Sequence, residues 1–178
     1  MKKILFIVTT LISVAATAQI KMPAASPTQT LSQDFGLGKI EIVYSRPGLK
    51  GRAAFGNGTL LAPTGVVWRT GANGATRVTF SDPVTIGDKT LAAGAYGLFT
   101  IPGENEWTII FNTNSKGWGS FEYKEAEDVV RVKVKPETTS NSTETFTINI
   151  NNITPETATI SLQWAKTLVN VPIKTDIK

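Results

Sequence analysis

Apolar and polar side chains alternate at every second position along much of the chain after residue 27. In residues 130–135, for example, Val130, Val132 and Val134 are separated by charged side chains. A period of two is typical of a β-strand with one buried face and one face in water. From this pattern and from the β-branched and aromatic content, we expect strands over residues 39–45, 76–80, 96–101, 107–112, 130–135, 146–150, 157–164 and 168–173.

Turn-forming residues divide these segments at short intervals. Gly36-Leu37-Gly38 separates the first two strands, and the pair Gly87-Asp88 suits a tight hairpin. Residues 137–143 and 151–156 have the composition of polar loops. About ten strands and little helix, with a short turn within residues 122–128, predict an all-β fold, namely a two-sheet β-sandwich of jelly-roll or immunoglobulin-like type.

The first residues have the composition of an export signal. Lys2 and Lys3 precede an apolar run over residues 4–16, and Ala16-Thr17-Ala18 offers the small side chains that a signal peptidase requires. The run is shorter than the about 20 apolar residues that a membrane span needs, which disfavours a retained anchor. We expect a cleaved signal peptide over residues 1–18 and a single domain over residues 19–178 without a transmembrane segment. The expected location is periplasmic or secreted after cleavage near Ala18.

Charge and composition exclude several classes of function for this 178-residue chain. After loss of Lys2 and Lys3, 16 basic side chains face 14 acidic ones, and the net charge of +2 is too small to indicate a nucleic acid as partner. Histidine and cysteine are absent, which excludes Ser-His-Asp and Cys-His catalysis, imidazole or thiolate metal sites and disulfides. We expect neither a metal nor another cofactor.

Arginines cluster in one part of the chain. Residues 44–73 hold three of the five arginines and the first of four tryptophans, beside an irregular stretch from Pro47 to Pro63. A guanidinium presents a planar set of donors that suits carboxylate, sulfate or phosphate. These arginines either bind such a ligand or satisfy the carbonyl groups of the irregular stretch. The candidate ligand-binding residues are Arg46, Arg52, Trp68, Arg69, Asn73 and Trp118.

Two further groups of side chains leave alternatives open. Trp118 lies between glycines, where it either stacks against a sugar or partner or folds back over the end of the sheets. Glu122, Glu125 and Asp128 are candidates for the paired carboxylates of a glycoside hydrolase or lyase, although their spacing selects no pair.

Several motifs together resemble a known family. They are Tyr44-Ser45-Arg46-Pro47, the block Val67-Trp68-Arg69-Thr70-Gly71-Ala72-Asn73 and Leu91-Ala92-Ala93-Gly94-Ala95-Tyr96. The chain resembles the exported bacterial proteins of Bacteroidetes type grouped as domain of unknown function 2911, from Ser26 to about Pro136, and its last forty residues match only as generic strands. The resemblance implies export and a mostly β domain, and it supplies no activity and no catalytic residue.

Three functional hypotheses follow from the sequence. The first is a non-enzymatic protein that binds a small anionic or saccharide ligand, or a partner in the cell envelope, through the clustered arginines. The second is a carboxylate-dependent hydrolase or lyase. The third is a structural envelope module whose arginines bond only to internal acceptors.

Overall fold

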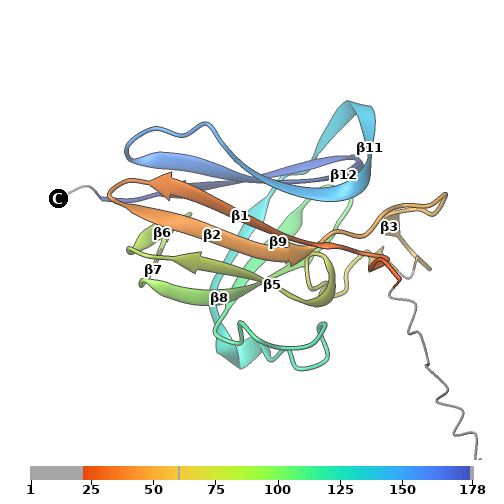
Figure 1. Ribbon diagram of the computed structural model, residues 1–178, viewed down its shortest axis with the longest axis horizontal. Helices are drawn as coiled ribbons and strands as arrows, with labels where there is room; N and C mark the ends of the chain where they lie inside the picture. The colour runs from red at the N-terminus through yellow and green to blue at the C-terminus, as the bar shows by residue number, and fades with distance from the viewer. Residues whose placement is uncertain (1–21, 60, 177–178) are drawn as a thin grey trace, which may run out of the picture.

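The computed structural model describes residues 22–59 and 61–176, and Figure 1 shows an all-β protein. The predicted signal peptide over residues 1–18 lies outside the described residues. The larger sheet has six antiparallel strands in the order β1-β2-β5-β8-β9-β10. Its strands are β1 (Thr28–Phe35), β2 (Gly38–Ser45), β5 (Ala72–Phe80), β8 (Gly94–Ile101), β9 (Trp107–Asn112) and β10 (Asp128–Val134).

A second antiparallel sheet has four strands in the order β11-β12-β6-β7. These strands are β11 (Glu137–Asn151), β12 (Thr157–Lys174), β6 (Val84–Ile86) and β7 (Lys89–Leu91). The short strands β3 (Phe55–Gly56) and β4 (Ala62–Pro63) form a separate parallel pair. Figure 1 shows β3 at the end of the molecule opposite the C-terminus.

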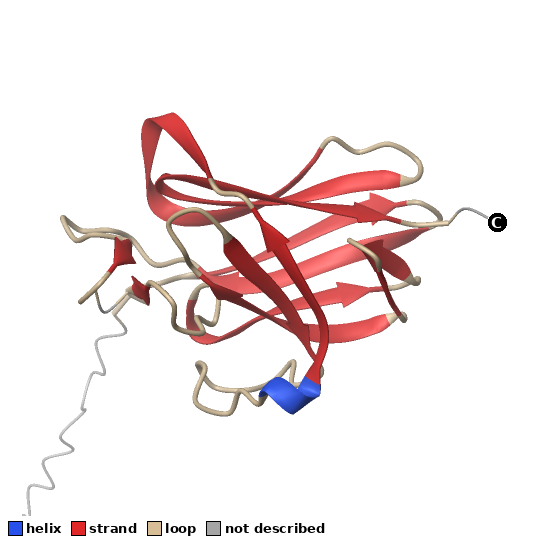
Figure 2. Ribbon diagram, turned by 180° about the vertical axis from the view of Figure 1, so that it is seen from behind, coloured by secondary structure: helices blue, strands red, loops and turns tan. Residues whose placement is uncertain are grey.

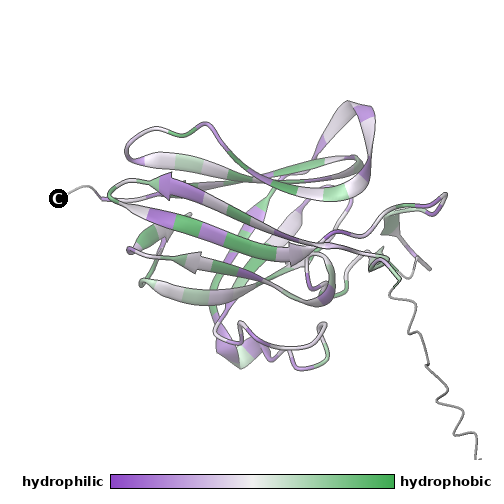
Figure 3. Cartoon of the chain, in the orientation of Figure 1, coloured by the Kyte–Doolittle hydropathy of each residue, from purple (hydrophilic) through white to green (hydrophobic). Residues whose placement is uncertain are grey.

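The two large sheets share one hydrophobic core. Alternate side chains of β2, such as Ile40 and Ile42, are fully buried and belong to the same cluster as Ile148 of β11 and Ile160 of β12. Figure 3 shows the corresponding alternation of hydrophobic and hydrophilic positions along β2. A buried hydrogen bond also crosses between the sheets, since the Ile148 backbone N–H donates to the hydroxyl of Tyr44 at 2.9 Å. The period-two pattern of the sequence therefore marks the buried faces correctly.

Five aromatic side chains form one contiguous group within the core, hereafter the aromatic cluster. They are Phe55, Trp68, Trp107, Phe146 and Trp164. The rings of Trp68 and Trp164 stack with centroids 5.8 Å apart and an interplanar angle of 13°. Phe55 meets Trp68, Trp107 and Trp164 edge to face at 6.1, 5.0 and 5.8 Å. Through Phe55, the irregular segment that carries β3 and β4 is attached to both sheets.

Helix is limited, within the described residues, to the short 3-10 helix η1 (Glu125–Glu127), drawn in blue in Figure 2. This confirms the short turn expected within residues 122–128. Among the residues that the structure describes, no helix combines the length and apolarity of a membrane-spanning segment.

The second sheet differs from the sequence-based expectation in two places. The polar loop predicted over residues 137–143 is wrong, because β11 begins at Glu137 and pairs there with Leu168 of β12. The pairing is irregular, however, and Thr138 and Thr143 oppose Thr167 and Ala165 across a shift in register. The strands predicted over residues 157–164 and 168–173 are one continuous strand that passes through Ala165, whose φ is +50°.

Candidate functional site

A cavity of about 410 Å³, hereafter the cationic pocket, opens beside the irregular segment. Its lining residues come from four parts of the chain: the start of the described residues, the segment after β2, the turn that leads into β5 together with the first residues of β5, and β12. The polar side chains among them are Ser26, Lys50, Arg52, Arg69 and Asn73, and buried Trp164 of the aromatic cluster also contributes to the wall. The described residues that line the pocket include three basic side chains and no acidic one.

Arg69 is the most informative residue of the cationic pocket. Its side chain is half-buried, and the Nε atom is buried without a hydrogen-bond partner among the described residues. Burial lowers the pKa of Arg69 from its ordinary value, because desolvation disfavours the charged form. A buried guanidinium normally has an acceptor, since an unsatisfied buried polar group costs about 1–3 kcal/mol. Arg69 therefore brings to the wall of the pocket a partly desolvated guanidinium whose Nε has no acceptor among the described residues.

The backbone around Arg69 is held firmly in place. The backbone groups of Trp68 exchange two hydrogen bonds with Thr100 of β8, at 2.7 and 2.9 Å. Arg69 itself accepts a hydrogen bond from the backbone of Thr76 at 3.1 Å. Gly71 lies so close to β2 that an added Cβ would be 2.9 Å from the carbonyl oxygen of Ser45, which excludes larger residues there. The turn from Trp68 to Gly71 thus fixes the direction from which Arg69 reaches the pocket.

Lys50 and Arg52 line the same pocket from the segment after β2. The Arg52 guanidinium folds back on its own loop and donates to the carbonyl oxygens of Leu49 and Gly48, both at 2.9 Å. The backbone N–H of Lys50 donates to a carboxylate oxygen of Glu144 at 2.7 Å. The Lys50 contact holds the loop against β11, whereas the Arg52 contacts lie within the loop. Two of the five N–H donors of Arg52 have acceptors in the described structure, and the side chain remains exposed at the pocket.

Asn73 completes the polar lining. Its side-chain amide donates to the Ser45 hydroxyl at 3.2 Å and to the Ser26 carbonyl at 3.4 Å. Asn73, Thr70 and Lys50 all have φ between +49° and +61°, a left-handed conformation that is uncommon for residues other than glycine. Such conformations persist where the surrounding contacts determine them, and they concentrate at functional sites.

Three residues predicted for the site lie elsewhere. Arg46 donates through Nε to the Phe146 carbonyl at 3.1 Å and through Nη2 to the Thr147 hydroxyl at 2.8 Å, which links the end of β2 to β11. Trp68 is 2% exposed and donates to the Gly71 carbonyl at 3.1 Å, as part of the aromatic cluster. Trp118 is 63% exposed on the loop between β9 and β10 and does not line the cationic pocket. Of the predicted residues, Arg52, Arg69 and Asn73 meet at this pocket.

Sequence reasoning missed two residues that the arrangement makes relevant. Lys50 lines the cationic pocket and lies within the motif that drew attention to Arg52, so its charge could have been noticed. Phe121, in the same loop as Trp118, is 87% exposed. The sequence around Phe121 shows no pattern from which its exposure could be predicted.

Of the candidate carboxylates, Asp128 belongs to a compact hydrogen-bonded group, hereafter the Asp128 cluster, consisting of Asn112, Tyr123, Asp128 and Arg131. One Asp128 oxygen accepts from the Asn112 amide at 2.7 Å, and the other accepts from the Tyr123 hydroxyl and from Arg131, both at 2.7 Å. The side chain of Asp128 is only 5% exposed. Glu125 lies 3.4 Å from the same Arg131 nitrogen but is 75% exposed.

The surroundings of Tyr123 in this cluster alter its acidity. Burial, together with the hydrogen bond to Asp128 and the negative charge of Asp128, raises the pKa of Tyr123 to about 12. A carboxylate that already accepts three short hydrogen bonds is poorly placed to take a proton from a substrate. Among the residues that the structure describes, no three acidic side chains gather in an arrangement suited to a metal ion.

The fold and the site together define an all-β protein of antiparallel sheets with a basic pocket at one end. The chain belongs to the family described as Protein of unknown function (DUF2911), whose model matches residues 26–173. The match extends beyond Pro136, where the recognisable motifs end, through β11 and nearly all of β12. Among curated proteins and among solved structures, none matches this chain significantly.

Proposed function

We propose that this protein is an exported β-sandwich, of jelly-roll or immunoglobulin-like type, that binds a small anion or the anionic group of an acidic saccharide in the cationic pocket. The observation that carries the proposal is Arg69, whose buried Nε lacks an acceptor among the described residues. Protein atoms cover Nε itself, so a carboxylate, sulfate or phosphate in the pocket would form charge-assisted hydrogen bonds with the terminal nitrogens of the guanidinium and offset its partly desolvated charge.

The composition of the pocket supports the same ligand class. Lys50 and Arg52 add positive charge to that of Arg69, and no acidic side chain of the described residues lines the cavity to neutralise it. The Asn73 amide and the Ser26 hydroxyl provide neutral groups for the hydroxyls of a sugar. A volume of about 410 Å³ lies within the range that holds small ligands.

Calorimetric titration with sulfate, phosphate and glucuronate tests this proposal, with glucose as the uncharged counterpart of glucuronate. We expect at least one of the anions to bind, and Arg69→Met to weaken that binding about tenfold or more through loss of charge-assisted hydrogen bonds. The matched control is Arg77→Met, because Arg77 is 40% exposed on the six-stranded sheet and pairs with Glu41 at 3.7 Å.

Two results would contradict the proposal. The first is the absence of a binding signal with all three anions at constant ionic strength. The second is equal weakening by Arg69→Met and Arg77→Met, which would indicate a nonspecific effect of net charge.

Export forms a separate part of the proposal, supported by the pattern of residues 1–18. Edman sequencing of protein recovered from the periplasm or the medium of the producing bacterium should begin at Gln19. Recovery only of chains that retain Met1, inside the cell, would contradict export.

A further inference from the structure

A second pocket, hereafter the aromatic pocket, lies across the irregular segment from the cationic pocket. The segment between them consists of residues 47–59 and 61–64 and is called here the partition segment. Lys50, Arg52 and Leu61 of this segment line the cationic pocket, whereas Phe55 and Thr64 line the aromatic pocket. The volume of the aromatic pocket is about 270 Å³, smaller than that of the cationic pocket.

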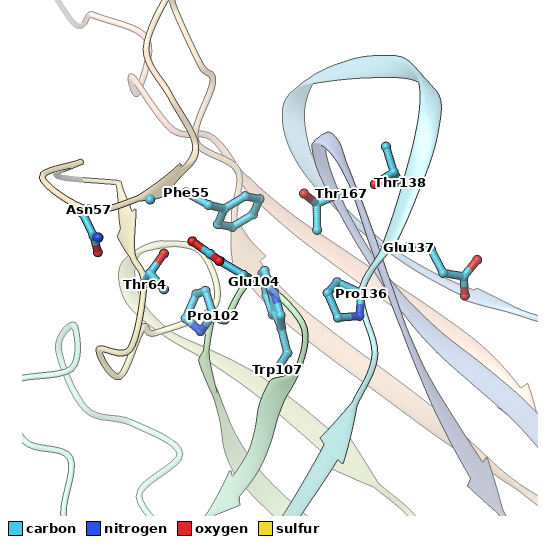
Figure 4. A pocket seen from close by; sticks show the side chains of 12 residues that line it. Phe55, Asn57, Thr64, Pro102, Glu104, Trp107, Pro136, Glu137, Thr138 and Thr167 are labelled. Atoms are coloured by element: carbon cyan, nitrogen blue, oxygen red, sulfur yellow. The ribbon is translucent and has the colours of Figure 1, made fainter.

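The charges of the two pockets are opposite. Glu104 and Glu137 line the aromatic pocket, and none of its described lining residues is basic. Figure 4 shows the Glu104 side chain directed between Phe55 and Thr64, whereas the Glu137 carboxylate points away. Glu137 accepts a hydrogen bond from Asn170 at 3.0 Å. Glu104 therefore supplies the negative charge inside the cavity.

Glu104 has no hydrogen-bond or ion-pair partner among the described residues. The nearby Glu106, two positions later in the sequence, does have one. The ammonium group of Lys133 contacts the carboxylate of Glu106 at 2.7 Å. Glu106 does not line the aromatic pocket. Lys133 is thus paired outside the cavity, and the Glu104 carboxylate inside the cavity is available to a ligand.

Aromatic rings form a corner of the same cavity. The centroids of Phe55 and Trp107 are 5.0 Å apart, and their planes meet at 76°. Trp107 is 3% exposed and fixes the position of Phe55, which is only partly buried and presents its ring to the pocket. An ammonium group within about 6 Å of an aromatic centroid is attracted to the face of the ring, and adjacent perpendicular rings are a common way to hold such groups.

We propose that the aromatic pocket binds an organic ammonium group, with the Glu104 carboxylate as its counter-ion and Phe55 as its aromatic contact. The hydroxyl group of Thr64, toward which the Glu104 side chain is directed in Figure 4, can accept a further N–H donor of a primary ammonium. The ligand class is a small amine, such as an amino sugar with a free amino group. This site is separate from the anion site proposed above and does not depend on it.

Glucosamine and N-acetylglucosamine discriminate an ammonium site from a general sugar site, because the two share the ring and differ in charge at one nitrogen. Titration of ¹⁵N-labelled protein, followed by NMR, should show glucosamine shifting the amide signals of Phe55 and Trp107. We expect N-acetylglucosamine to bind about tenfold more weakly or not at all, and tetramethylammonium to shift the same signals through the aromatic contact alone.

Glu104→Gln is the decisive variant, since it keeps the size of an exposed side chain and removes its charge. It should weaken glucosamine binding about tenfold, as expected for loss of one charge-assisted contact. Glu106→Gln is the matched control and should leave binding unchanged, because Glu106 points its charge at Lys133.

Three results would overturn this inference. They are equal binding of N-acetylglucosamine and glucosamine, unchanged affinity in Glu104→Gln, and the absence of a shift with both glucosamine and tetramethylammonium. The ¹⁵N spectrum of each variant reports directly on folding, so that loss of binding is not confused with loss of structure.

Discussion

Arg69 is half-buried and Arg131 is exposed, and the two arginines differ in their hydrogen-bond partners in the opposite sense from their exposure. One nitrogen of Arg131 contacts the Asp128 carboxylate at 2.7 Å, the Tyr123 hydroxyl at 3.0 Å and Glu125 at 3.4 Å. Nε of Arg69 is buried without any acceptor among the described residues. Where each polar group has an internal partner, the group serves the fold. A desolvated donor without an acceptor lowers the stability of the fold. Ligand binding is the simplest explanation for keeping such a donor.

The polar groups around each arginine are also organised differently. Asp128 joins β10 to the preceding loop, since Asn112 of β9 donates both to its carboxylate and to the Lys124 carbonyl. The Asp128 cluster therefore acts as a polar clamp at the end of the six-stranded sheet. In the cationic pocket, by contrast, hydrogen bonds hold the backbone, and the charged side chains of Lys50, Arg52 and Arg69 line an open cavity.

The largest expected effect is on the Asp128 cluster. Asp128→Ala removes the acceptor of Asn112, Tyr123 and Arg131 together, and we expect the free energy of unfolding to fall by about 2–3 kcal/mol. Urea denaturation at neutral pH measures this change. Glu125→Ala is the control at the exposed side of Arg131 and should cost less than about 0.5 kcal/mol. Equal losses in the two variants would remove the distinction between the buried and the exposed acid.

In the cationic pocket, substitution of Arg69 should have a smaller effect on the free energy of unfolding, and in the opposite direction. Arg69→Met replaces an unpaired guanidinium by an apolar chain of similar length, and the free energy of unfolding should stay constant or rise by about 1 kcal/mol. Arg46→Met provides the contrast, because Arg46 donates to Phe146 and Thr147. Its loss should cost about 1–2 kcal/mol. If Arg69→Met destabilised the protein as much as Arg46→Met, Arg69 would be a structural residue.

Alkaline pH should affect the Asp128 cluster through Tyr123. The pKa of Tyr123 is raised to about 12, above the ordinary value of 10.0, and burial is the largest cause. The folded state therefore binds the phenolic proton more tightly than the unfolded state does. This contribution to stability is complete below about pH 10 and is lost as the pH rises through about 12.

Tyr123→Phe tests the origin of that alkaline loss. The variant lacks the hydroxyl that donates to Asp128 and should be less stable at neutral pH by about 1 kcal/mol. Its unfolding midpoint should also fall less steeply between about pH 10 and pH 12, because one titrating group has gone. A decline as steep as that of the wild type would assign the alkaline loss to other groups.

The smallest effect is expected at Trp118. Its side chain is 63% exposed, so Trp118→Ala should change the free energy of unfolding by no more than about 0.5 kcal/mol. Thermal unfolding followed by circular dichroism measures this. A loss of several kcal/mol would show that the indole is buried in solution and would favour the alternative in which the loop folds back over the sheets.

The strands were predictable from the sequence wherever apolar and polar residues alternate and one face of the strand packs against the core. Val130 to Val134 and Phe146 to Ile150 show the pattern and form strands, because burying every second side chain dominates strand energetics. The loop predicted over residues 137–143 is wrong because their Thr, Ser and Asn side chains carry no apolar alternation, yet their backbone still pairs with β12. Two-residue strands such as β3 have no periodicity at all.

The candidate site was predictable only in part, for reasons of distance along the chain. The clustering of arginines in sequence drew attention to Arg52, Arg69 and Asn73, which line one pocket in the structure. It could not show that Arg46 points to Phe146, which lies a hundred positions later, and gave no sign of the pocket that contains Glu104. Closeness in sequence identifies residues that meet across a turn. The hydrogen-bond acceptors of Arg46 lie on another sheet, and their position depends on the topology of the fold.

Phe55 touches the walls of both pockets, since its ring contacts Trp107 in the aromatic pocket and Trp164 in the cationic pocket. If a ligand in the aromatic pocket displaced this ring, the packing of Trp164 would change with it, and so would the free energy of binding in the cationic pocket. Thermodynamic linkage requires the influence to be mutual and equal in factor, so an amine and an anion that both bind would act as heterotropic effectors of each other.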